Sequence, residues 1–418
     1  MRLTVGPSQL AAEETFRELR ERGSVLPVTL PEGLQAWVVT RHAEGRQVLR
    51  DPRFVKDLPA LTRDGQGFQG HRYAEDVVVT EGRHMLNSDG ADHIRLRAVV
   101  APLFTPHAVA DRGAEIADIA VGLTDRLTKG PTADLMQSYA QPLPEQVLSR
   151  IIGFSDEIGE HAAVLSRQLG RRANPTEPAM RRAYSDMVDL VKVASRDPAP
   201  DDTVIAALQT AVAARVVNRR EAVATIMMLL AAGIATTAVA IGTGIARLMW
   251  SGAVLRSMLA SEQTASLLVE ELLRHHPPAP FSPWRFTRAA VEVDGTVIPA
   301  NSVVFVLLAA ANRDPAVFAD PDELRPGRST SGHLSFGQGP HYCIGAHLAR
   351  HEVTIALQML FDRLPHVRPA VPYTDIAWRG LLFDRTMNAF PVLTGAASTP
   401  ADEHVKASWD SLPPRTPS

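Results

Sequence analysis

The stretch that decides the fold is LSFGQGPHYCIGAHLAR, residues 334–350, which contains Cys343, the only cysteine of the chain. Gly337 and Gly339 precede the sulfur in a predicted turn, and Gly345 follows it where a helix-forming run begins. A thiol at a helix N-terminus is stabilised as thiolate by the helix dipole and by free backbone N–H groups, and thiolate is the form that binds metal. A lone cysteine is most often a small buried hydrophobic residue, but this setting favours a metal-ligand loop.

These residues resemble the cysteine loop of the cytochrome P-450 family, whose pattern is Phe-Gly-x-Gly-x-His-x-Cys-x-Gly. Every position of that pattern is filled, by Phe336, Gly337, Gly339, His341, Cys343 and Gly345. The resemblance implies that Cys343 is the thiolate ligand of a haem b iron and that the other loop residues help to bind the haem. It also implies one mainly α domain with a smaller β region, spanning residues 1–395. The haem would lie between a long distal helix and the helix that follows the cysteine.

The composition is that of an ordinary globular protein: 418 residues, 45% of them hydrophobic and 21% charged, with a formal net charge of −3. There is no basic bias that would suggest nucleic acid. One cysteine excludes an internal disulfide and points to a reducing compartment. No apolar signal-peptide core follows Met1. We therefore expect a cytoplasmic protein.

One segment raises the question of a membrane, because residues 222–246 contain no charged side chain and are long enough to span a bilayer. A central helix buried on all sides would be equally apolar. The middle of the segment is small and hydroxylated rather than rich in leucine, and no similar segment accompanies it. The pattern favours a buried helix over a membrane span.

The remainder of the chain reads as mostly helical. Helix signals begin at Glu13–Arg22, a strand is predicted near Ala36–Thr40, and residues 61–92 read as a long loop. Residues 92–273 are predicted to be mostly helical, with breaks near 170–180 and 198–201. Residues 285–308 alternate as strands around a hairpin turn at Asp294-Gly295. A Pro- and Asp-rich meander, residues 312–333, leads into the cysteine loop, and the tail 396–418 is expected to be disordered.

Two further motifs fit the resemblance. Glu271 and Arg274 resemble the Glu-x-x-Arg element that braces the family's core, and Arg328 matches its third partner from the meander. Alone, such an i,i+3 pair would most often be a solvated surface ion pair. Haem also carries two propionates, which need cationic or donor partners when they are buried. By resemblance, these partners are His93, Arg97, Arg285 and His341.

The uncharged helix is expected to cross the distal face of the haem, where the family pattern is Ala-Gly-x-(Asp or Glu)-Thr. Here Ala232 and Gly233 leave room for dioxygen, and Thr236 keeps the hydroxyl that holds the proton network. The acid is missing, since Ala235 occupies its position. Water held by Thr236 or a polar group of the substrate could supply the protons. Alternatively, the enzyme performs chemistry that depends less on a proton relay.

The substrate pocket implied by the resemblance is largely apolar, as small-molecule pockets are. Its predicted parts are the 70–90 loop, the 165–185 connection, Ile234 and Ala235, residues 281–284, and Leu382 with Phe383. No nucleotide-binding glycine loop is present, so electrons would arrive through separate proteins, a ferredoxin and its reductase. We expect a monomer that binds ferredoxin near Arg95 and Arg350.

The sequence thus predicts a haem-thiolate monooxygenase that inserts one oxygen atom from O2 into a small hydrophobic substrate, a secondary metabolite. The composition and the resemblance together suggest a soluble bacterial protein of actinomycete type. Two alternatives remain open at the level of sequence. The first is an oxidative coupling, dehydrogenating or peroxide-driven enzyme, which the residue at position 235 motivates. The second is a haem-binding sensor or carrier without turnover, against which the retained Thr236 argues.

Overall fold

The fold is described from a computed structural model, which covers residues 1–6, 8–30, 33–57, 82–170, 178–250, 253–329, 332–380 and 385–395. The helices up to residue 213 are α1 (Gln9–Arg22), α2 (His42–Arg50), α4 (Gly90–Val100), η1 (Ala101–Phe104), α5 (Pro106–Ala110), α6 (Gly113–Leu127), the π-helical turn η2 (Met136–Ala140), α7 (Pro142–Ile152), α8 (Asp156–Gly170), α9 (Pro178–Ala194) and α10 (Val204–Ala213). The later helices are α11 (Arg219–Trp250), α12 (Ala253–Ser257), η3 (Met258–Ala260), α13 (Glu262–His275), α14 (Leu308–Ala311), η4 (Gly339–His341), α15 (Ala346–Arg363) and η5 (Tyr373–Asp375).

The strands form small sheets at the margin of this helical body. The largest has the order β1-β2-β8-β5-β3, in which only β2 and β8 run parallel. A second sheet has the order β4-β12-β9, and two further pairs are β6 with β7 and β10 with β11. The strands are β1 (Val25–Thr29), β2 (Gln35–Val39), β3 (Phe54–Val55), β4 (Thr132–Asp134), β5 (Arg285–Thr287), β6 (Val291–Val293), β7 (Thr296–Ile298), β8 (Val303–Val306), β9 (Arg368–Pro369), β10 (Trp378–Arg379), β11 (Thr386–Met387) and β12 (Pro391–Leu393).

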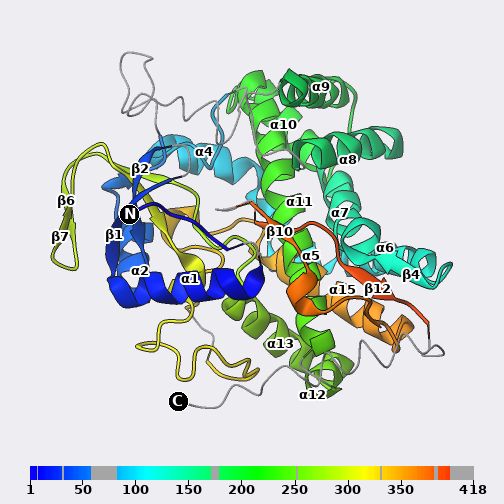
Figure 1. Ribbon diagram of the computed structural model, residues 1–418. Coiled ribbons are helices and arrows are strands. Elements are labelled where there is room, and N and C mark those ends of the chain that lie inside the picture. The colour runs from blue at the N-terminus through cyan, green and yellow to red at the C-terminus, as the bar shows by residue number, and fades with distance from the viewer. Residues whose placement is uncertain are drawn as a thin grey trace.

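Helix α11 is the axis of the molecule and runs through its centre, with α6 to α10 on one side and the five-stranded sheet with α1 and α2 on the other (Figure 1). It passes the length and composition test for a membrane span, yet 72% of its most apolar window is buried by the rest of the described chain. A helix that is apolar all round is what a buried central position requires. The predicted buried helix is therefore confirmed.

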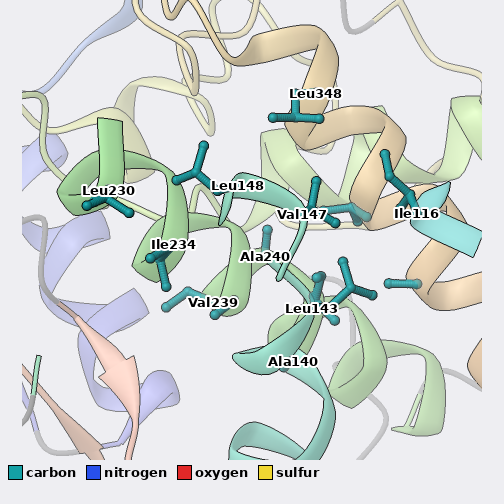
Figure 2. Close-up of a cluster of buried hydrophobic side chains, with 14 of the residues drawn as sticks. Ile116, Ala140, Leu143, Val147, Leu148, Leu230, Ile234, Val239, Ala240 and Leu348 are labelled. Carbon is teal, nitrogen blue, oxygen red and sulfur yellow. The ribbon is translucent and has the colours of Figure 1, made fainter. Parts of the chain in front are cut away.

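A hydrophobic cluster holds α11 against its neighbours (Figure 2). Leu143 and Val147 of α7 point toward Ala240 of α11, while Leu348 of α15 closes the cluster from the opposite side. Among the element pairs, α11 has some of its most extensive contacts with α7 and α15. This packing fixes the long helix relative to the helix that follows the cysteine.

The predicted secondary structure is mostly confirmed, with local exceptions. The hairpin β6–β7 turns at Asp294-Gly295, whose φ angles of 46° and 71° are the left-handed values that a tight hairpin turn needs. Strand β4 interrupts the region 92–273, which was predicted to be mostly helical. It forms by pairing with β12, some 260 residues away, so the local sequence does not reveal it. The predicted long loop is described only from residue 82 onward, and the predicted disordered tail, residues 396–418, lies outside the described residues.

Candidate functional site

The cysteine loop is a compact turn between the meander and α15, and it contains η4. The backbone N–H of Cys343 donates to the carbonyl of Phe336 at 2.9 Å, and the N–H of Gly337 donates to Leu334 at 2.8 Å. Gly345 is the N-cap of α15, so the cysteine lies two residues before the cap of an 18-residue helix. The loop is therefore held by its own backbone, and it presents the sulfur at a helix N-terminus as the sequence predicts.

Gly337 and Gly339 are required by the backbone conformation, because their φ angles are 71° and 75°. At Gly339 a second constraint applies. A Cβ atom there would lie 2.8 Å from the carbonyl oxygen of Leu49, at the end of α2. Glycine thus allows the cysteine loop to dock directly on α2.

The Cys343 thiol keeps exposed surface although protein surrounds it closely enough to desolvate it. Burial raises the pKa of the thiol, whereas the backbone N–H of Gly345 and the charges of Arg97 and Arg350 act in the opposite direction. A thiol that is desolvated yet accessible can contact a ligand that binds inside the protein. A cation bound to the sulfur would tip this balance toward thiolate.

Two of the predicted propionate partners meet in space. The rings of His93 (α4) and His341 (η4) lie with their centroids 4.3 Å apart. Nε2 of His341 is 3.3 Å from Oδ1 of Asp89, whereas Nε2 of His93 is buried without a hydrogen-bond partner. A buried donor without an acceptor is costly, so His93 is poised to bind a group that the protein chain does not supply.

Asp89 connects three segments that are distant in sequence. Its Oδ2 accepts the backbone N–H groups of Lys56 at 2.7 Å and Asp57 at 2.9 Å, while Oδ1 contacts His341. Burial alone would raise the pKa of this carboxyl, but the hydrogen bonds from His341, Asp57 and Lys56 lower it to about 2. Burial in turn lowers the pKa of His341 to about 4, against the effect of Asp89. Asp89 therefore fixes the position of the imidazole.

The remaining cations approach the same place. Arg285 is buried, donates to the carbonyls of Phe54 (3.3 Å) and Leu49 (3.1 Å), and keeps a buried Nε without a partner. Burial lowers its pKa to about 10, and Asp89 opposes that shift. Burial also lowers the pKa of Arg97, while the neighbouring Cys343 raises it. Arg97 thus lies within reach of the charge on the sulfur.

This set of groups fits a haem. His93 Nε2 and Arg285 Nε are buried without partners, and among the described residues Arg97 and Arg285 approach the same place as the carboxylate Asp89. Such groups are suited to bind buried propionates. The sulfur just before α15 is of the donor type that would hold a haem iron. The described structure brings together Cys343, His93, Arg97, Arg285 and His341, and their roles toward a haem stay a prediction. Phe336, Gly337 and Gly345 lie in the same loop.

Helix α11 changes character at its middle. Ala231, Ala232 and Ala235 are exposed although nearly all of the surrounding helix is buried. The hydroxyl of Thr236 donates to the carbonyl of Ala232 at 2.6 Å, so its lone pairs remain available as acceptors. The helix thus presents a strip of small side chains with one hydroxyl, and the neighbouring position 235 is an alanine instead of an acid.

The structure shows why position 233 is glycine, and the reason differs from the predicted one, which was to leave room for dioxygen. A Cβ at this position would lie 3.0 Å from Cδ2 of Leu148, so the missing side chain faces α7 and not the exposed strip. Figure 2 shows Leu148 reaching from α7 toward the turn of α11 that contains Leu230 and Ile234. Gly233 lets the two helices approach, and its part in oxygen binding stays a prediction.

The Glu-x-x-Arg element is buried and fully formed. Arg274 donates twice to the Glu271 carboxylate, at 2.7 and 2.9 Å, and both side chains are 0% exposed. Arg274 also donates to the carbonyls of Asn312 and Pro321 in the meander. Nε of Arg328 lies 3.0 Å from Glu271, so the predicted third partner is present. The element joins α13 to the meander that precedes the cysteine loop.

The predicted docking arginines are engaged within the chain. Arg350 pairs with Glu270 at 2.5 Å and lies over the Phe336 ring at 4.3 Å. Arg95 pairs with Glu221 at 2.7 Å and with Asp92 at 2.8 Å. Of the predicted pocket residues, those at 70–81 and 171–177, together with Leu382 and Phe383, lie outside the described residues.

Sequence reasoning missed two members of the site. Lys56 is 2% exposed, and its Nζ donates to the carbonyls of Pro283 (3.3 Å) and Trp284 (2.8 Å), just before Arg285. Asp89 also escaped notice. Its position four residues before His93 was a usable signal, because aspartate there is a typical helix N-cap. The partners of Lys56 are more than 220 residues away, and nothing in the sequence identifies them.

Comparisons with known proteins agree with this geometry. A family model described as Cytochrome P450 matches residues 264–371. The chain is 33% identical to Cytochrome P450 107B1 of Saccharopolyspora erythraea, over 93% of this chain and 98% of that protein. It is 32% identical to 6-deoxyerythronolide B hydroxylase of the same organism, over 90% and 95% of the two chains.

A solved structure shows the same fold. The tirandamycin C-bound P450 monooxygenase TamI superimposes with a TM-score of 0.82 and 31% identity, over 92% of this chain and 97% of that chain. The similarity covers both the helical body and the sheets, so it confirms the mainly α fold with a smaller β region. It also confirms the resemblance that the cysteine loop suggests.

Proposed function

Because the chain belongs to the bacterial cytochrome P450 family and is a P450 monooxygenase, we propose that it inserts one oxygen atom from O2 into a small hydrophobic secondary metabolite, with electrons from a ferredoxin and its reductase. The observation that carries the proposal is the presence of both the Cys343 loop before α15 and an exposed strip of small residues on α11, the helix that packs against α15. Relatives named as hydroxylases of such metabolites support the substrate class. We place the haem domain at residues 1–395 of a cytoplasmic monomer.

Each residue of the site has a defined task in this function. Cys343 would bind the haem iron, while His93, Arg97, Arg285 and His341 would bind the propionates. Thiolate-ligated haem iron supplies the oxygen activation when it is bound, and the electron push from sulfur favours O–O cleavage. The protein must deliver protons to the distal side and exclude bulk water. Thr236 holds the hydroxyl nearest to that task, and the apolar strip around Ala235 leaves space for the substrate.

The proposal is tested with purified haem-loaded protein, a ferredoxin system, O2 and a panel of hydrophobic metabolites. Substrates are first selected by the shift that they cause in the ferric haem spectrum, and products are then identified by mass. We expect a product heavier by one oxygen atom, and labelled O2 must supply that atom. A spectral binder that is recovered unchanged under all conditions would argue for a carrier instead.

A second candidate function is favoured by one observation, the alanine at position 235. Without the distal acid, a reaction that depends less on proton delivery becomes competitive, such as oxidative coupling, dehydrogenation or peroxide-driven oxidation. The same assay separates these outcomes. A product lighter by two hydrogens, a dimer, or turnover with peroxide but not with ferredoxin would favour the second candidate.

The surface of α2 suits the docking of a ferredoxin better than the predicted surface around Arg95 and Arg350, because those two arginines already pair with carboxylates of this chain. Arg46 and Arg50 of α2 are exposed, and no carboxylate partner for either is found among the described residues. Arg46 donates to Gln338 of the cysteine loop, and α2 contacts η4. An acidic partner could therefore approach the cysteine side over α2, which we propose as its docking surface.

A further inference from the structure

Three polar side chains form a cluster between α13, the end of the meander and α15. Nε of Arg350 donates to Oε1 of Glu270 at 2.5 Å, and its Nη2 donates to Oε2 at 3.1 Å. Nε2 of His333 lies 3.2 Å from the same Oε2. Because Nδ1 of His333 accepts the backbone N–H of Ser335, the ring is neutral and donates to the carboxylate through Nε2. Glu270 therefore accepts hydrogen bonds from both neighbours.

The cluster holds a lasting pair of opposite charges. Burial alone would raise the pKa of Glu270, but the hydrogen bonds from His333 and Arg350 lower it to about 2. Burial acts to lower the pKa of Arg350, but the carboxylate raises it. Arg350 and Glu270 are 28% and 23% exposed, so solvent screens the pair only in part. Both groups are charged at neutral pH.

The guanidinium of Arg350 lies against the cysteine loop. Its central carbon is 4.3 Å from the centroid of the Phe336 ring, and Nη1 donates to the hydroxyl of Tyr342 at 3.3 Å. The carbonyl of Phe336 accepts the N–H of Cys343, and Tyr342 directly precedes the cysteine. The bonds to Glu270 thus hold a positive charge against two residues that adjoin Cys343.

This charge acts on the sulfur. Burial raises the pKa of the Cys343 thiol, whereas the charges of Arg97 and Arg350 lower it. In the proposed function Arg97 binds a propionate, whose negative charge would offset its own. Arg350 is paired with Glu270 instead, and of this pair the arginine is the member that acts on the thiol. Its charge would therefore remain effective beside the sulfur when haem is bound.

A cation in this position affects how readily the iron is reduced. A thiolate ligand donates electron density to the iron, and the hydrogen bonds and charges around the ligand tune the reduction potential. Reduction adds one electron and breaks no bond, so the net charge becomes more negative by one. A nearby positive charge stabilises that state. Arg350 should accordingly raise the reduction potential.

We propose that the charge of Arg350 sets the reduction potential of the haem, and that Glu270, itself fixed by His333, is the positioning residue that holds this charge against the cysteine loop. The proposal rests on the proposed function, because it requires Cys343 to bind the iron. A surface hollow of about 480 Å³ includes Glu270, His333, Phe336 and Arg350 in its lining. Water in this hollow would hydrate the guanidinium if the carboxylate did not hold it, so the position of the charge depends on Glu270.

The first test measures the reduction potential of the haem-loaded protein by equilibrium titration with dithionite and mediator dyes. Neither ferredoxin nor substrate is present, so docking and turnover cannot contribute. Arg350→Gln should lower the equilibrium constant for reduction roughly tenfold, a shift of about 59 mV to lower potential for one electron. Arg363→Gln is the matched control, because Arg363 also lies on α15 and pairs with a carboxylate, that of Asp125. The control should match the wild type, and an unchanged potential in Arg350→Gln would overturn the proposal.

The variant Glu270→Gln separates the positioning role from a direct effect of charge. Loss of a negative charge near the haem would by itself raise the potential, whereas release of Arg350 into the hollow lowers it. We expect a lower potential, by part of the shift in Arg350→Gln. An unchanged or higher potential would refute the positioning role. Arg350→Lys, which keeps the charge but not the two parallel hydrogen bonds, should recover part of the shift.

The iron–sulfur stretching frequency is a readout that mere loosening of the loop would not mimic. Without the cation the sulfur donates more strongly to the iron, so Arg350→Gln should raise this frequency in resonance Raman spectra. A loosened loop would weaken the bond and lower the frequency, and that outcome would exclude the electrostatic role of Arg350. If the reduced carbonyl adduct of the wild type lacks the red-shifted Soret band of sulfur ligation, the proposed function fails instead.

Discussion

At the scale of single residues, Cys343 has a role that no other side chain can take. The chain contains no second cysteine, and the backbone around the sulfur is fixed by bonds to its own loop. We expect Cys343→Ser to bind haem weakly through the propionate partners but to lose thiolate ligation. The reduced carbonyl adduct of the wild type should show the red-shifted Soret band of sulfur ligation. If the serine variant retains that band, Cys343 is not the ligand.

Ala235 offers a test of the missing acid. Glutamate at this position would place a carboxylate beside Thr236 in the exposed strip of α11. If proton delivery limits the enzyme, Ala235→Glu should raise coupled product formation on the order of tenfold, below the full effect of a positioned general acid. Ala235→Gln, which adds similar bulk without an acid, is the control. Unchanged or lower turnover in Ala235→Glu would contradict a relay deficit.

The residue scale also shows what the sequence can predict. The setting of Cys343 is legible from its own loop, whereas His93, Arg97 and His341 were identified through the family resemblance, and the structure brings them together. Lys56 and Asp89 were not identified, because their significance depends on partners from other segments. Gly233 was noticed for its small size, but the contact that requires it is with Leu148 of another helix.

At the scale of elements, the buried ion pair between Glu271 and Arg274 stabilises the connection between α13 and the meander. Removing the charge of Glu271 leaves Arg274 buried without its carboxylate, which typically costs about 3–5 kcal/mol. We expect Glu271→Gln to lower the free energy of unfolding by that amount or to prevent folding. Glu262→Gln, at an exposed position of the same helix, should cost less than about 1 kcal/mol. Urea unfolding of both variants makes the comparison, and equal midpoints would refute this role.

A buried carboxyl on helix α15 should make the stability of the protein depend on pH. Glu352 is buried with an Oε2 that has no partner, and burial raises the pKa of its carboxyl to about 8. Between the ordinary glutamate pKa of 4.5 and about 8, the folded state therefore binds a proton that the unfolded state has lost. Stability should fall as pH rises through this window, by at most about 1.4 kcal/mol per unit from this group. Glu352→Gln should flatten the slope in urea titrations, and an unchanged slope would show that Glu352 is not its source.

Element types were predictable where periodicity or turn residues are strong, as in α11 and in the β6–β7 hairpin. The short strands of the C-terminal region were not. Strand β12 pairs with β4 and β9, and each pairing contributes only two or three residues. Such strands depend on partners that the folded chain provides, so their local sequence carries little signal.

At the scale of the whole molecule, surface charge should govern the meeting with the electron donor. We expect the double exchange Arg46→Glu with Arg50→Glu to slow reduction by ferredoxin roughly tenfold at low salt and to leave the haem spectrum unchanged. The rate difference should shrink as ionic strength rises. Arg181→Glu with Arg182→Glu, exposed on the distant helix α9, is the control. If both double variants behave alike, the α2 surface is not the docking site.

The architecture as a whole follows from resemblance rather than from physical reasoning on single segments. The cysteine loop identifies the family, and the family supplies the arrangement of helices around α11. Without the resemblance, the length of 418 residues would allow two or three domains, and the apolar helix would be open to interpretation as a membrane span. Its burial by α7 and α15 resolves that ambiguity in the structure.

The solitary sulfur of this chain has a practical consequence for anyone who purifies it. A reagent that reacts with thiols finds at most one target per molecule, and coordination would mask that target. Colorimetric counting of free thiols would then report directly the proportion of preparation that lacks its pigment. A new cysteine introduced anywhere on the outside could carry a dye or an electrode tether with no background to remove first.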